Sequence, residues 1–570
     1  MMIKASDAIA KVLAANNIKF GFELIGGMIA HLVDSINQLG ETRLISMHHE
    51  QGAAFAAGGV SRASNHHGMG LALGTSGPGA TNLITGITDC WLDSHPCLFL
   101  TGQVNTYEQK NGAAVRQQGF QELDIVTIVD SVTKYACKIQ TIEEIIPCLQ
   151  KAIDIAIEGR PGPVLLDIPM DLQRKELNEK ELRYLDDFIV KKNNECLPYD
   201  TFQSVMEELE VAEKPLFLIG GGAVNSKSFK KWLKYLIVNN IPYVSSLKGS
   251  EKTTSSKNYY GLIGAYGTRT ANYAIQNCGL LIVVGSRMDI RQTGVNTDEF
   301  ANKARVIQID VDKSQLNNRV ICDNVIHASS ELFFKCFLNS KVTFKKDIAI
   351  WGECLKTHFM STCVDEYSDW VISPFQLFSS LNKLFNHEKM QYVVDVGNNQ
   401  MWAAHTLRLT EKQAAHYSGG LGTMGFAIPT SIGVYCVTTE MVVVIVGDGG
   451  AQLNIQELDI IAREQLPILV IVLNNSSLGM VRGFQEMYFD GRNTSTYWQG
   501  YSSKFKEIGE AYNLESVAID DLSKFTEIIE KFKSNPKPFL LEVLMPDARE
   551  CRPRLEFGNS IDEQSPAVSL

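Results

Sequence analysis

Short apolar runs alternate with helix-length amphipathic segments along most of this 570-residue chain. That alternation is typical of parallel α/β layers, in which each strand is followed by a helix. The clearest strand patterns are YVVDVGNN, MVVVIVGDGG and PILVIVLNN, and polar or glycine residues follow the apolar run in each of them. Ligands bind at the carboxyl ends of strands in such sheets. The pattern therefore predicts doubly wound parallel sheets with sites at these strand ends.

The pattern weakens at three places, and these divide the chain. The charged stretch at 174–195 is interpreted as a solvated linker, and the segment Lys341–Asp369 as a second connection. A chain of this length is too long for one core. We therefore predict three doubly wound domains and a polar tail lying over the surface, with the boundaries 1–175, 195–340, 370–545 and 546–570.

Composition and charge narrow the class of protein. The chain is 45% hydrophobic and 21% charged, as in ordinary globular proteins. Its net charge of −11 argues against nucleic acid or an anionic membrane as the main partner. The 12 cysteines include no C-x-x-C pair, which is typical of reduced thiols. No apolar run approaches the roughly 18 residues that span a membrane, and the first residues read as an amphipathic helix. We expect a cytoplasmic enzyme.

Two neighbouring strand ends carry candidate metal ligands. Asp448 closes one strand, and Asn475 closes the next. Asn454 followed by Glu457 matches a capping box and predicts a helix at about 455–464 between them. A strand–helix–strand crossover makes the two strands parallel and adjacent. Both side chains are therefore expected at one edge of the sheet.

These residue types suit a magnesium–phosphate site. A buried carboxylate needs a cation nearby, and Mg²⁺ binds few protein oxygens because it takes others from water and phosphate. Gly449 and Gly450 allow backbone N–H groups to approach a phosphate at the helix entrance. A strand that simply ends in a turn is the competing interpretation of Gly-Asp-Gly alone. The paired asparagines that follow favour the metal site, and the absence of G-x-x-x-x-G-K-[ST] excludes a P-loop.

The Gly-Asp-Gly motif, with Asn474 and Asn475 behind it, resembles the cofactor motif of the thiamine diphosphate (ThDP) enzymes. The resemblance implies that Mg²⁺ is held by Asp448, Asn475 and the main-chain carbonyl of Ser477. In this family the ion bridges the cofactor's diphosphate, so a magnesium ion would be the cation that Asp448 requires.

A glutamate near the N-terminus matches a second part of the same family's site. Glu50 falls in the first turn of a predicted Ala-rich helix, where the helix dipole alone favours it by about 0.3–1 kcal/mol. The following stretch LALGTSGPGATNLITGI resembles the family's T-S-G-P-G-x-x-N turn. The resemblance implies that Glu50 hydrogen-bonds the aminopyrimidine ring of ThDP and so promotes removal of the thiazolium proton. The cofactor is then the electron sink for decarboxylation.

SGGLGTMGFAIP supplies the other half of the implied cofactor site. Met424 matches the apolar residue that supports the bent cofactor, and Gly422 matches a backbone acceptor, although a methionine in an apolar stretch is more often core. Because Glu50 and Asp448 lie in different domains, some interface must join them. In the family that interface is between subunits, so the resemblance implies a homodimer or tetramer.

The resemblance covers nearly the whole chain and is closest to the acetolactate synthase large subunit. The middle segment, with IGGGAVNS, GLIGAYGTRTANYA, GSRMDIRQTG and QIDVD, resembles that branch's FAD-binding stretches, although glycine-rich strand ends are also purely structural. The branch is further matched at Thr101–Val104, Gly119–Val126, Gly162–Asp171 and Gln400–Ala404.

The resemblance implies three sets of site residues besides the metal ligands. The catalytic set is Glu50, Phe120 and Gln121. The ThDP set is Gly26, Gly27, Val396, Gly397, Asn398, Asn399, Gly422, Met424, Gly449, Gly450, Gly479 and Met480. The FAD set is Gly220, Gly221, Gly222, Gly267, Thr268, Gly285, Arg287 and Asp310.

The chain departs from the acetolactate synthase pattern mainly where the acceptor would bind. It has LIGG at Leu24–Gly27 instead of Y-P-G-G, two asparagines instead of Gln-His, and Phe484 instead of an acceptor-selecting tryptophan. Ile290 replaces the aspartate of an Asp-Arg pair, while Arg291 remains. The smaller ring makes room, and the arginine becomes available to a carboxylate or a phosphate.

These observations predict a transferase that depends on ThDP, Mg²⁺ and FAD, decarboxylates pyruvate and transfers the two-carbon unit to a keto acceptor. The acceptor is either a second 2-keto acid, giving acetolactate, or a 4-keto deoxysugar nucleotide in branched-chain carbohydrate biosynthesis. Two alternatives stay open. One is a FAD-dependent pyruvate oxidase, and the other is a catalytically inactive subunit with the ThDP fold.

Overall fold

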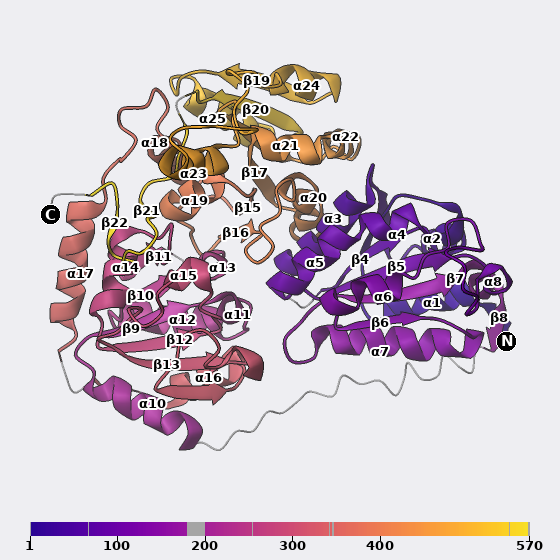
Figure 1. The fold of residues 1–570 in the computed structure, drawn as a ribbon, viewed down its shortest axis with the longest axis horizontal. Coiled ribbons are helices and arrows are strands. Elements are labelled where there is room, and N and C mark those ends of the chain that lie inside the picture. The colour runs from indigo at the N-terminus through magenta and orange to yellow at the C-terminus, as the bar shows by residue number, and fades with distance from the viewer. Residues whose placement is uncertain are drawn as a thin grey trace.

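The computed structural model describes residues 2–65, 68–178, 200–253, 255–340, 342–344, 347–546 and 548–567. It contains three six-stranded sheets, and every strand pairing within them is parallel. Helices cover both faces of each sheet (Figure 1). The predicted α/β class of doubly wound parallel sheets is therefore confirmed.

The N-terminal sheet has the strand order β3-β2-β4-β5-β7-β6. Its strands are β2 (Phe20–Glu23), β3 (Arg43–Ser46), β4 (Gly70–Gly74), β5 (Cys97–Gln103), β6 (Tyr135–Lys138) and β7 (Val164–Pro169). Its helices are α1 (Ala5–Ala15), α2 (Ala30–Leu39), α3 (Glu50–Ala63), α4 (Pro78–Asn82), α5 (Ile84–Asp93), α6 (Ile125–Val129), α7 (Ile145–Ile157) and α8 (Met170–Arg174).

Part of the predicted charged linker at 174–195 is a strand instead. β8 (Glu176–Asn178) pairs antiparallel with β1 (Met2–Lys4), and Leu177 is buried in the core beneath it. The sequence prediction was wrong here because one apolar side chain and a pairing with the first residues of the chain order the segment. Residues 179–199, the rest of that predicted linker, lie outside the described residues.

The central sheet has the order β11-β10-β9-β12-β13-β14. Its strands are β9 (Pro215–Ile219), β10 (Tyr243–Ser245), β11 (Tyr259–Leu262), β12 (Leu280–Val284), β13 (Arg305–Asp310) and β14 (Asn324–His327). Its helices are α10 (Asp200–Val211), α11 (Gly221–Val224), α12 (Phe229–Val238), α13 (Leu247–Ser250), α14 (Arg269–Asn277), α15 (Ile290–Thr293) and α16 (Ser330–Ser340).

The predicted connection at 341–369 contains a 14-residue helix, α17 (Ala349–Thr362). Trp351 and Leu355 are buried in the same apolar cluster as Ala271 and Ile275 of α14. The segment was predicted only as a connection, and its helix was missed because its apolar residues do not gather on one helical face. The helix is stabilised by packing against α14 rather than by its own pattern.

The C-terminal sheet has the order β16-β15-β17-β18-β20-β19. Its strands are β15 (Met390–Val394), β16 (Gln413–Tyr417), β17 (Met441–Gly447), β18 (Ile468–Asn474), β19 (Glu515–Ile519) and β20 (Phe539–Leu544). Its helices are α18 (Pro374–Leu384), α19 (Asn398–Thr406), α20 (Ala427–Thr438), α21 (Asp448–Leu453), α22 (Leu458–Arg463), α23 (Gly479–Tyr488), α24 (Phe505–Ala511) and α25 (Phe525–Ser534).

The crossover between β17 and β18 confirms two predictions and corrects a third. The two strands are parallel neighbours, as predicted. The helix expected at about 455–464 is present as a 3-10 turn at Ile455–Glu457 that continues into α22, and an additional helix, α21, precedes it from Asp448. Asn454 does not cap a helix, because its amide donates to the carbonyl of Gly425 at 2.9 Å. Glu457 accepts the backbone N–H of His48 at 3.3 Å instead, so tertiary contacts use both side chains of the predicted capping box.

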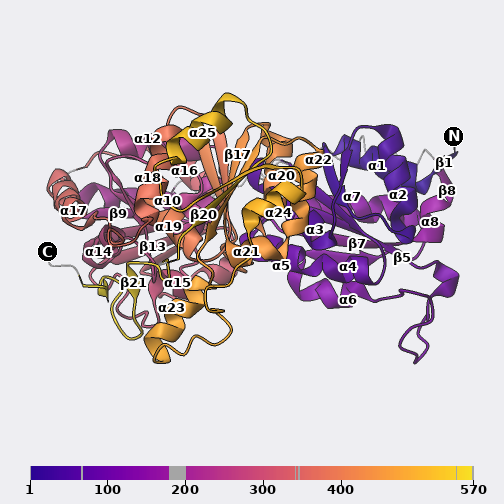
Figure 2. The same cartoon turned by 90° about the horizontal axis from the view of Figure 1, so that it is seen from above.

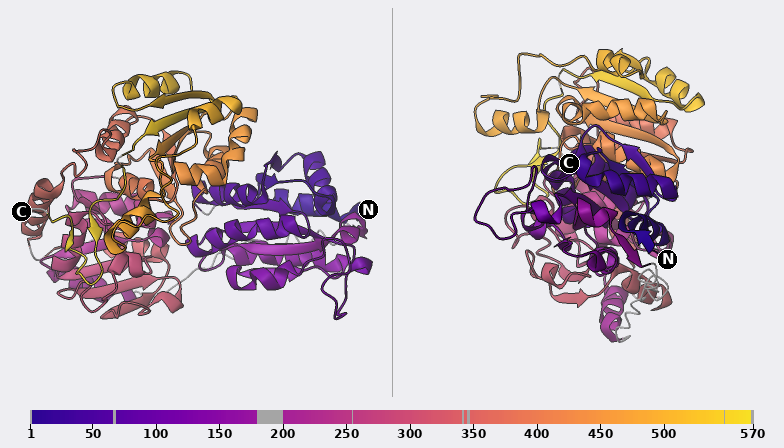
Figure 3. Two further views of the ribbon diagram at one scale, coloured as in Figure 1. Left: turned by 45° about the horizontal axis from the view of Figure 1, so that its top comes forward. Right: turned by 90° about the vertical axis from the view of Figure 1, so that its right-hand side faces the viewer.

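Two helices join the N-terminal and C-terminal sheets into one core. α3 and α20 pack along each other, and their residues belong to a single apolar cluster with strands of both sheets (Figure 2). A Cβ at Gly59 would clash with the carbonyl oxygen of Thr430, and one at Gly433 with that of Ala56. These two glycines allow the backbones of the helices to approach closely. Figure 3 shows the central sheet and the N-terminal sheet at opposite ends of the molecule, with the C-terminal sheet between and above them.

The predicted surface tail is anchored more firmly than expected. It forms a small hairpin, β21 (Arg554–Leu555) with β22 (Gln564–Ser565). Asn272 of α14 donates to the carbonyl of Ile561 at 2.7 Å, and Gln564 donates to that of Gly267 at 2.8 Å. Ile561 is buried. The tail therefore returns from the C-terminal sheet to the central one, which its polar sequence does not indicate.

Candidate active site

The predicted magnesium ligands meet at the carboxyl ends of β17 and β18. The backbone N–H of Ser477 donates to Asp448 Oδ2 at 3.1 Å, and Asn475 Nδ2 donates to the carbonyl of Ala548 at 2.5 Å. Burial raises the pKa of Asp448 to about 6, although backbone N–H groups oppose the shift. Within the described residues, no basic side chain forms an ion pair with Asp448. A divalent cation would stabilise its ionised form.

Polar atoms without partners lie among these ligands. Within the described part of the chain, both side-chain amide atoms of the buried Asn398 and Oγ of Ser477 have no hydrogen-bond partner. A Cβ at Gly479 would lie 2.7 Å from Asn475 Nδ2 and 2.8 Å from Asn398 Nδ2, so these groups converge on one point. Leaving such a group unpaired costs about 1–3 kcal/mol. The donors and acceptors present fit a bound diphosphate with its metal ion.

Three helices begin at this edge of the C-terminal sheet. α19 starts at Asn398, α21 at Asp448 and α23 at Gly479. Helix N-termini present unpaired N–H groups and a partial positive charge, which favour an anion. The carboxyl edge therefore combines one buried acidic ligand with three anion-attracting backbone ends.

The loop that carries Gly422 and Met424 faces the same edge. Met424 Cε lies 3.2 Å from the position that a Cβ on Gly449 would take. Asp395 fixes the end of the loop, since it accepts the N–H groups of Gly425 at 2.9 Å and Ala427 at 3.0 Å. Burial raises the pKa of Asp395 to about 7. Sequence reasoning missed Asp395, although an acidic residue within the apolar run YVVDVG was the available signal.

The residues predicted to meet the pyrimidine ring form a second cluster at the N-terminal sheet. Glu50 is the first residue of α3, is only 5% exposed, and accepts a hydrogen bond from Asn82 Nδ2 at 2.9 Å. A Cβ at Gly79 would lie 3.2 Å from Glu50 Oε1, and one at Gly77 3.0 Å from Gln121 Cβ. The glycine-rich turn thus holds Glu50 and Gln121 on its two sides.

Of the remaining predicted residues of this half, Gly26 lies against the start of that turn. A Cβ at Gly26 would meet the side chain of Thr75 at 2.5 Å, whereas one at Gly27 would meet nothing within 4 Å. Phe120 is 81% exposed. Sequence reasoning missed Asp167, whose carboxylate accepts a hydrogen bond from Gln103 Nε2. The same nitrogen donates to the carbonyl of Leu123, two residues after Gln121.

The two clusters are separate within one chain. No hydrogen bond or ion pair in the described part of the chain links Glu50 to Asp448, Asn475 or Ser477. α4 and α23 stand well apart in both Figure 1 and Figure 2. The structure therefore brings together the residues of each half but not the two halves.

A cavity of about 300 Å³ lies where the three sheets meet. Of the predicted FAD set, Gly221, Gly222, Gly285, Arg287 and Asp310 line it, and Arg291 does too. The N-terminal sheet adds Asp93 and Arg160 to its wall, and the C-terminal sheet adds Gly419.

Three predicted FAD residues do not line the cavity but support the strands and turns around it. A Cβ at Gly220 would clash with the carbonyl oxygen of Gly285, so this glycine allows the two strand ends to approach. Thr268 Oγ1 donates to the carbonyl of Tyr260 at 2.8 Å. The carbonyl oxygen of Gly267 accepts a hydrogen bond from the side-chain amide of Gln564 in the tail.

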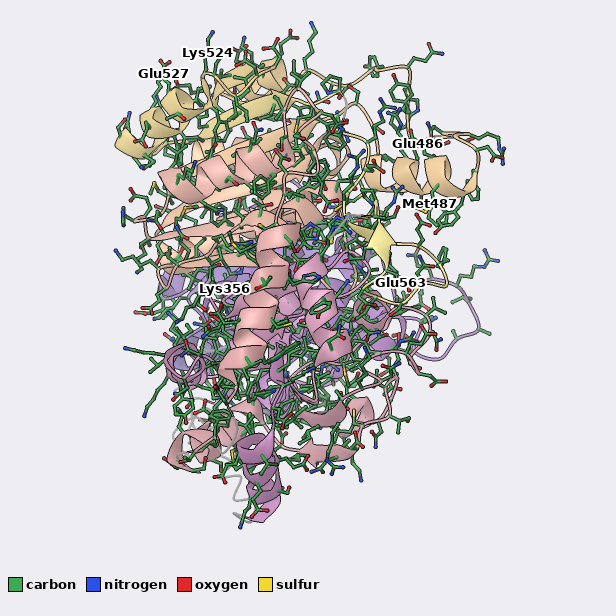
Figure 4. The ribbon with its side chains drawn as sticks, turned by 90° about the vertical axis from the view of Figure 1, so that its left-hand side faces the viewer. Lys356, Glu486, Met487, Lys524, Glu527 and Glu563 are labelled. Atoms are coloured by element: carbon green, nitrogen blue, oxygen red, sulfur yellow. The ribbon has the colours of Figure 1, made fainter. Side chains whose placement is uncertain are left out.

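The predicted acceptor residues lie near this cavity. Phe484 is 43% exposed and contacts the rings of Tyr488, Phe489 and Phe557 at centroid distances of 4.8, 5.6 and 6.4 Å. Figure 4 shows α23, which carries Glu486 and Met487, beside the tail segment that carries Glu563. Phe484 thus sits in an aromatic cluster shared by α23 and the tail.

Arg291 lies on the cavity side of the same region. Its guanidinium approaches Met401 Sδ at 3.9 Å, and no ion pair involves it in the described residues. Burial raises the pKa of Tyr266. The nearby charges of Arg291 and Arg554 oppose this shift, and Tyr488 adds to it. Arg291 and the aromatic cluster are therefore neighbours of the same tyrosine.

Three family models match the chain, one for each sheet. They are described as the N-terminal TPP binding domain of thiamine pyrophosphate enzymes, matching residues 3–128, the central domain, matching 202–335, and the C-terminal TPP binding domain, matching 395–543. Thiamine pyrophosphate is another name for ThDP. The fold and the site thus define a ThDP enzyme.

Curated relatives narrow the class. The acetolactate synthase isozyme 2 large subunit of Escherichia coli is 32% identical, with 98% of this chain and 99% of the relative covered. The probable acetolactate synthase large subunit of Methanocaldococcus jannaschii is 31% identical over 98% of this chain and 94% of the relative. The chain belongs to the acetolactate synthase large-subunit family of ThDP enzymes. The predicted family and class of enzyme, an acetolactate synthase-like carboligase, are confirmed. Among the described residues, every helix is too short or too polar to span a bilayer.

Proposed function

We propose that the protein is a Mg²⁺-dependent ThDP carboligase that decarboxylates pyruvate and transfers the resulting two-carbon unit to a keto acceptor. The observation that carries the proposal is the buried edge of the C-terminal sheet. There Asp448 has no cationic partner among the described residues, and the amide of Asn398 has no hydrogen bond. A diphosphate with a divalent ion supplies what both groups lack.

The residues of the chain take distinct roles in this proposal. Asp448, Asn475 and the Ser477 carbonyl would hold the metal ion, and the N-termini of α19, α21 and α23 would bind the diphosphate. Bound ThDP supplies a nucleophilic ring carbon and an electron sink for loss of CO₂. The carboxyl group of Glu50, oriented by Asn82, would hold a proton against the pyrimidine ring.

A second copy of the chain completes the site in this proposal. Each chain contains one pyrimidine half around Glu50 and one diphosphate half around Asp448, and the two are separate. A symmetric dimer joins each half to its complement twice. The proposed assembly is a homodimer or a tetramer of such dimers.

The central cavity is the proposed FAD site. Glycines at 221, 222 and 285 let a ligand approach the strand ends closely, and Arg287 and Asp310 supply charged groups on the wall. Because all three sheets contribute residues, a dinucleotide there would also stabilise their arrangement.

The acceptor is proposed to bind between Arg291 and Phe484. An arginine without an ion-pair partner suits a carboxylate or a phosphate, and a half-exposed Phe484 leaves space beside it. Both a second 2-keto acid and a 4-keto deoxysugar nucleotide meet these conditions.

Mass spectrometry of the products tests the proposal. The protein with ThDP, Mg²⁺ and FAD is incubated with pyruvate alone, with a second 2-keto acid, and with a 4-keto deoxysugar nucleotide. We expect release of CO₂ and a product that contains the acceptor plus a two-carbon unit. Absence of CO₂ release under all three conditions contradicts the proposal. Anaerobic bleaching of the flavin by pyruvate, at the rate of turnover, would indicate an oxidase instead.

A further inference from the structure

A buried cluster of charged side chains lies where the three sheets meet. Arg62 Nη2 contacts Asp89 Oδ2 at 2.6 Å and Asp93 Oδ2 at 3.0 Å. Lys248 Nζ contacts the same Asp93 oxygen at 3.3 Å and Glu251 Oε1 at 2.5 Å. Arg62, Asp89 and Asp93 are at most 2% exposed. Buried ion pairs rarely add net stability, so a second role is expected of them.

This cluster holds four consecutive residues of the C-terminal domain, Tyr417 at the end of β16 and the three residues that follow it. The carbonyl of Tyr417 accepts Arg62 Nη1 at 2.7 Å, and Ser418 Oγ donates to Asp89 at 2.5 Å. The N–H groups of Gly419 and Gly420 both donate to Asp93, at 3.1 and 2.7 Å. Side chains of the N-terminal sheet's helices therefore fix this backbone from outside its own domain.

The fixed residues begin the loop that carries Gly422 and Met424. The far end of the loop is held within its own domain, where Asp395 binds Gly425. At the near end, Asp93 accepts the N–H groups of both Gly419 and Gly420, while Gln400 holds the carbonyl of Ser418. Asp93 therefore contributes two of the hydrogen bonds that anchor the start of the loop next to the diphosphate half.

The same cluster forms part of the wall of the central cavity. Asp93, Lys248 and Gly419 all line it. A Cβ at Gly221 would lie 2.8 Å from Lys248 Cβ, and one at Gly419 2.7 Å from the Lys248 stem. A ligand in the cavity therefore contacts the groups that hold the start of the loop.

We propose that Asp93 is a positioning residue for the cofactor loop, and that Asp93 and Lys248 couple occupancy of the central cavity to the binding of ThDP. A dinucleotide in the cavity would favour the arrangement of Lys248, Asp93 and Gly419 seen in the structure. The loop would then be held in the form that receives ThDP. Thermodynamic linkage requires ThDP to favour the dinucleotide by the same factor. This inference rests on the proposed function, in that the loop is taken to contact ThDP.

Calorimetric titration of the full-length protein with ThDP and Mg²⁺, with and without saturating FAD, tests the coupling. For the wild type we expect FAD to lower the Kd for ThDP by about tenfold, within the usual range of such couplings. Titration with FAD, with and without ThDP, should give the same factor. Asp93→Asn should raise the Kd for ThDP and bring the factor close to one.

Asp34→Asn is the matched control, since Asp34 is an exposed residue of α2 that forms a long ion pair with Lys4, at 3.9 Å, far from the cavity. It should keep the wild-type factor. If Asp93→Asn does not fold, the same titrations are made with Lys248→Gln. Lys248 lines the cavity, forms an ion pair with Asp93, and is 17% exposed. Loss of the factor in Lys248→Gln supports the proposal.

The outcomes that overturn this inference differ from those that overturn the proposed function. A wild type that binds FAD but binds ThDP with the same Kd with and without it overturns the coupling alone. A wild type that does not bind FAD overturns the coupling and the proposed FAD site together. If a folded Asp93→Asn variant keeps the full effect of FAD on the Kd for ThDP, the coupling is overturned as well. A wild type that fails to bind ThDP at all overturns the proposed function as well.

Discussion

Glu50 and Asn82 form a hydrogen bond of 2.9 Å between the first residue of α3 and the last residue of α4. Thirty-two positions separate them in the sequence. The contact joins the two stretches on which the family resemblance of the N-terminal domain depends. It fixes the direction of the Glu50 carboxylate before any cofactor binds.

Replacing Glu50 tests the role of its proton. Glu50→Gln keeps an oxygen that can accept from Asn82 but removes the acid. We expect the rate of CO₂ release from pyruvate to fall by at least about a hundredfold, the usual range for a general acid–base group. Calorimetry should show that ThDP still binds. Decarboxylation at the wild-type rate would disprove the proposed role, and Glu158→Gln at the end of α7 is a surface control.

Replacing Asp448 tests the metal site. Asp448→Asn removes the one carboxylate among the three proposed ligands, so the Kd for Mg²⁺ should rise by at least about tenfold, equivalent to 1.4 kcal/mol. Because the metal ion would help to hold the diphosphate, binding of ThDP should weaken in parallel, and chelation of Mg²⁺ from the wild type should reproduce the loss. Titration of Mg²⁺ at fixed ThDP measures this. An unchanged Mg²⁺ requirement in the variant would exclude Asp448 as a ligand.

Enlarging Phe484 tests the acceptor pocket. Phe484→Trp fills space beside the rings of Tyr488 and Phe557. We expect the ratio of kcat/KM values to shift toward small 2-keto acids by roughly tenfold or more, since one group of this size in a pocket is worth about 1–3 kcal/mol. Competition between two acceptors in one reaction, followed by mass spectrometry, gives the ratio directly. An unchanged product spectrum would show that Phe484 does not contact the acceptor.

The buried Glu457 predicts a pH-dependent stability. Burial raises its pKa from 4.5 to about 7, so its carboxyl is protonated in the folded chain between these values and ionised in the unfolded chain. Its contribution is fully present below pH 4.5 and is lost as the pH rises through 7. The wild type should therefore lose up to about 3 kcal/mol relative to Glu457→Gln over this interval.

Urea unfolding of both proteins at pH 5 and pH 8 measures the difference. Glu507→Gln, at an exposed carboxylate paired with Lys504, is the control for replacing an acid by an amide. A stability difference between the wild type and Glu457→Gln that does not change with pH would contradict this account.

The close approach of α3 and α20 predicts opposite effects at two helical glycines. Gly433→Ala should destabilise the protein by about 1–3 kcal/mol, because its Cβ would clash with the backbone of Ala56. Gly352→Ala in α17 meets nothing within 4 Å and should stabilise the helix by roughly 0.5–1 kcal/mol. Thermal unfolding of the two variants distinguishes them. A Gly433→Ala protein as stable as the wild type would mean that the helices separate at little cost.

Local motifs were enough to predict the strands and the crossover on which the proposed diphosphate half depends. Asp448 and Asn475 close strands that the apolar pattern identifies, and a single crossover makes those strands neighbours. The same pattern gave the α/β class. These predictions were right because each depends on short-range chemistry and on one general rule of chain topology.

The errors have a common cause, which is that tertiary contacts override local signals. Asn454 and Glu457 match a capping box, yet their side chains bind Gly425 and His48. α17 and the tail hairpin are held by α14, whose Asn272 binds Ile561. In the sequence, Asp93 is simply the last residue of an ordinary helix. Nothing nearby indicates its partners Gly419 and Gly420, which lie more than three hundred residues away.

The sequence by itself determined the class of fold, the family, and which residues close the strands of the C-terminal sheet, since these follow from periodicity and from motifs within a few dozen residues. Only the tertiary structure decided what surrounds those residues. It brings Glu50 to Asn82, separates that pair from Asp448 within one chain, and places the Arg62–Asp93 cluster under the cofactor loop. The physical reason is that burial, and with it the cost of an unpaired charge or amide, is a property of the packed chain and not of any segment of it.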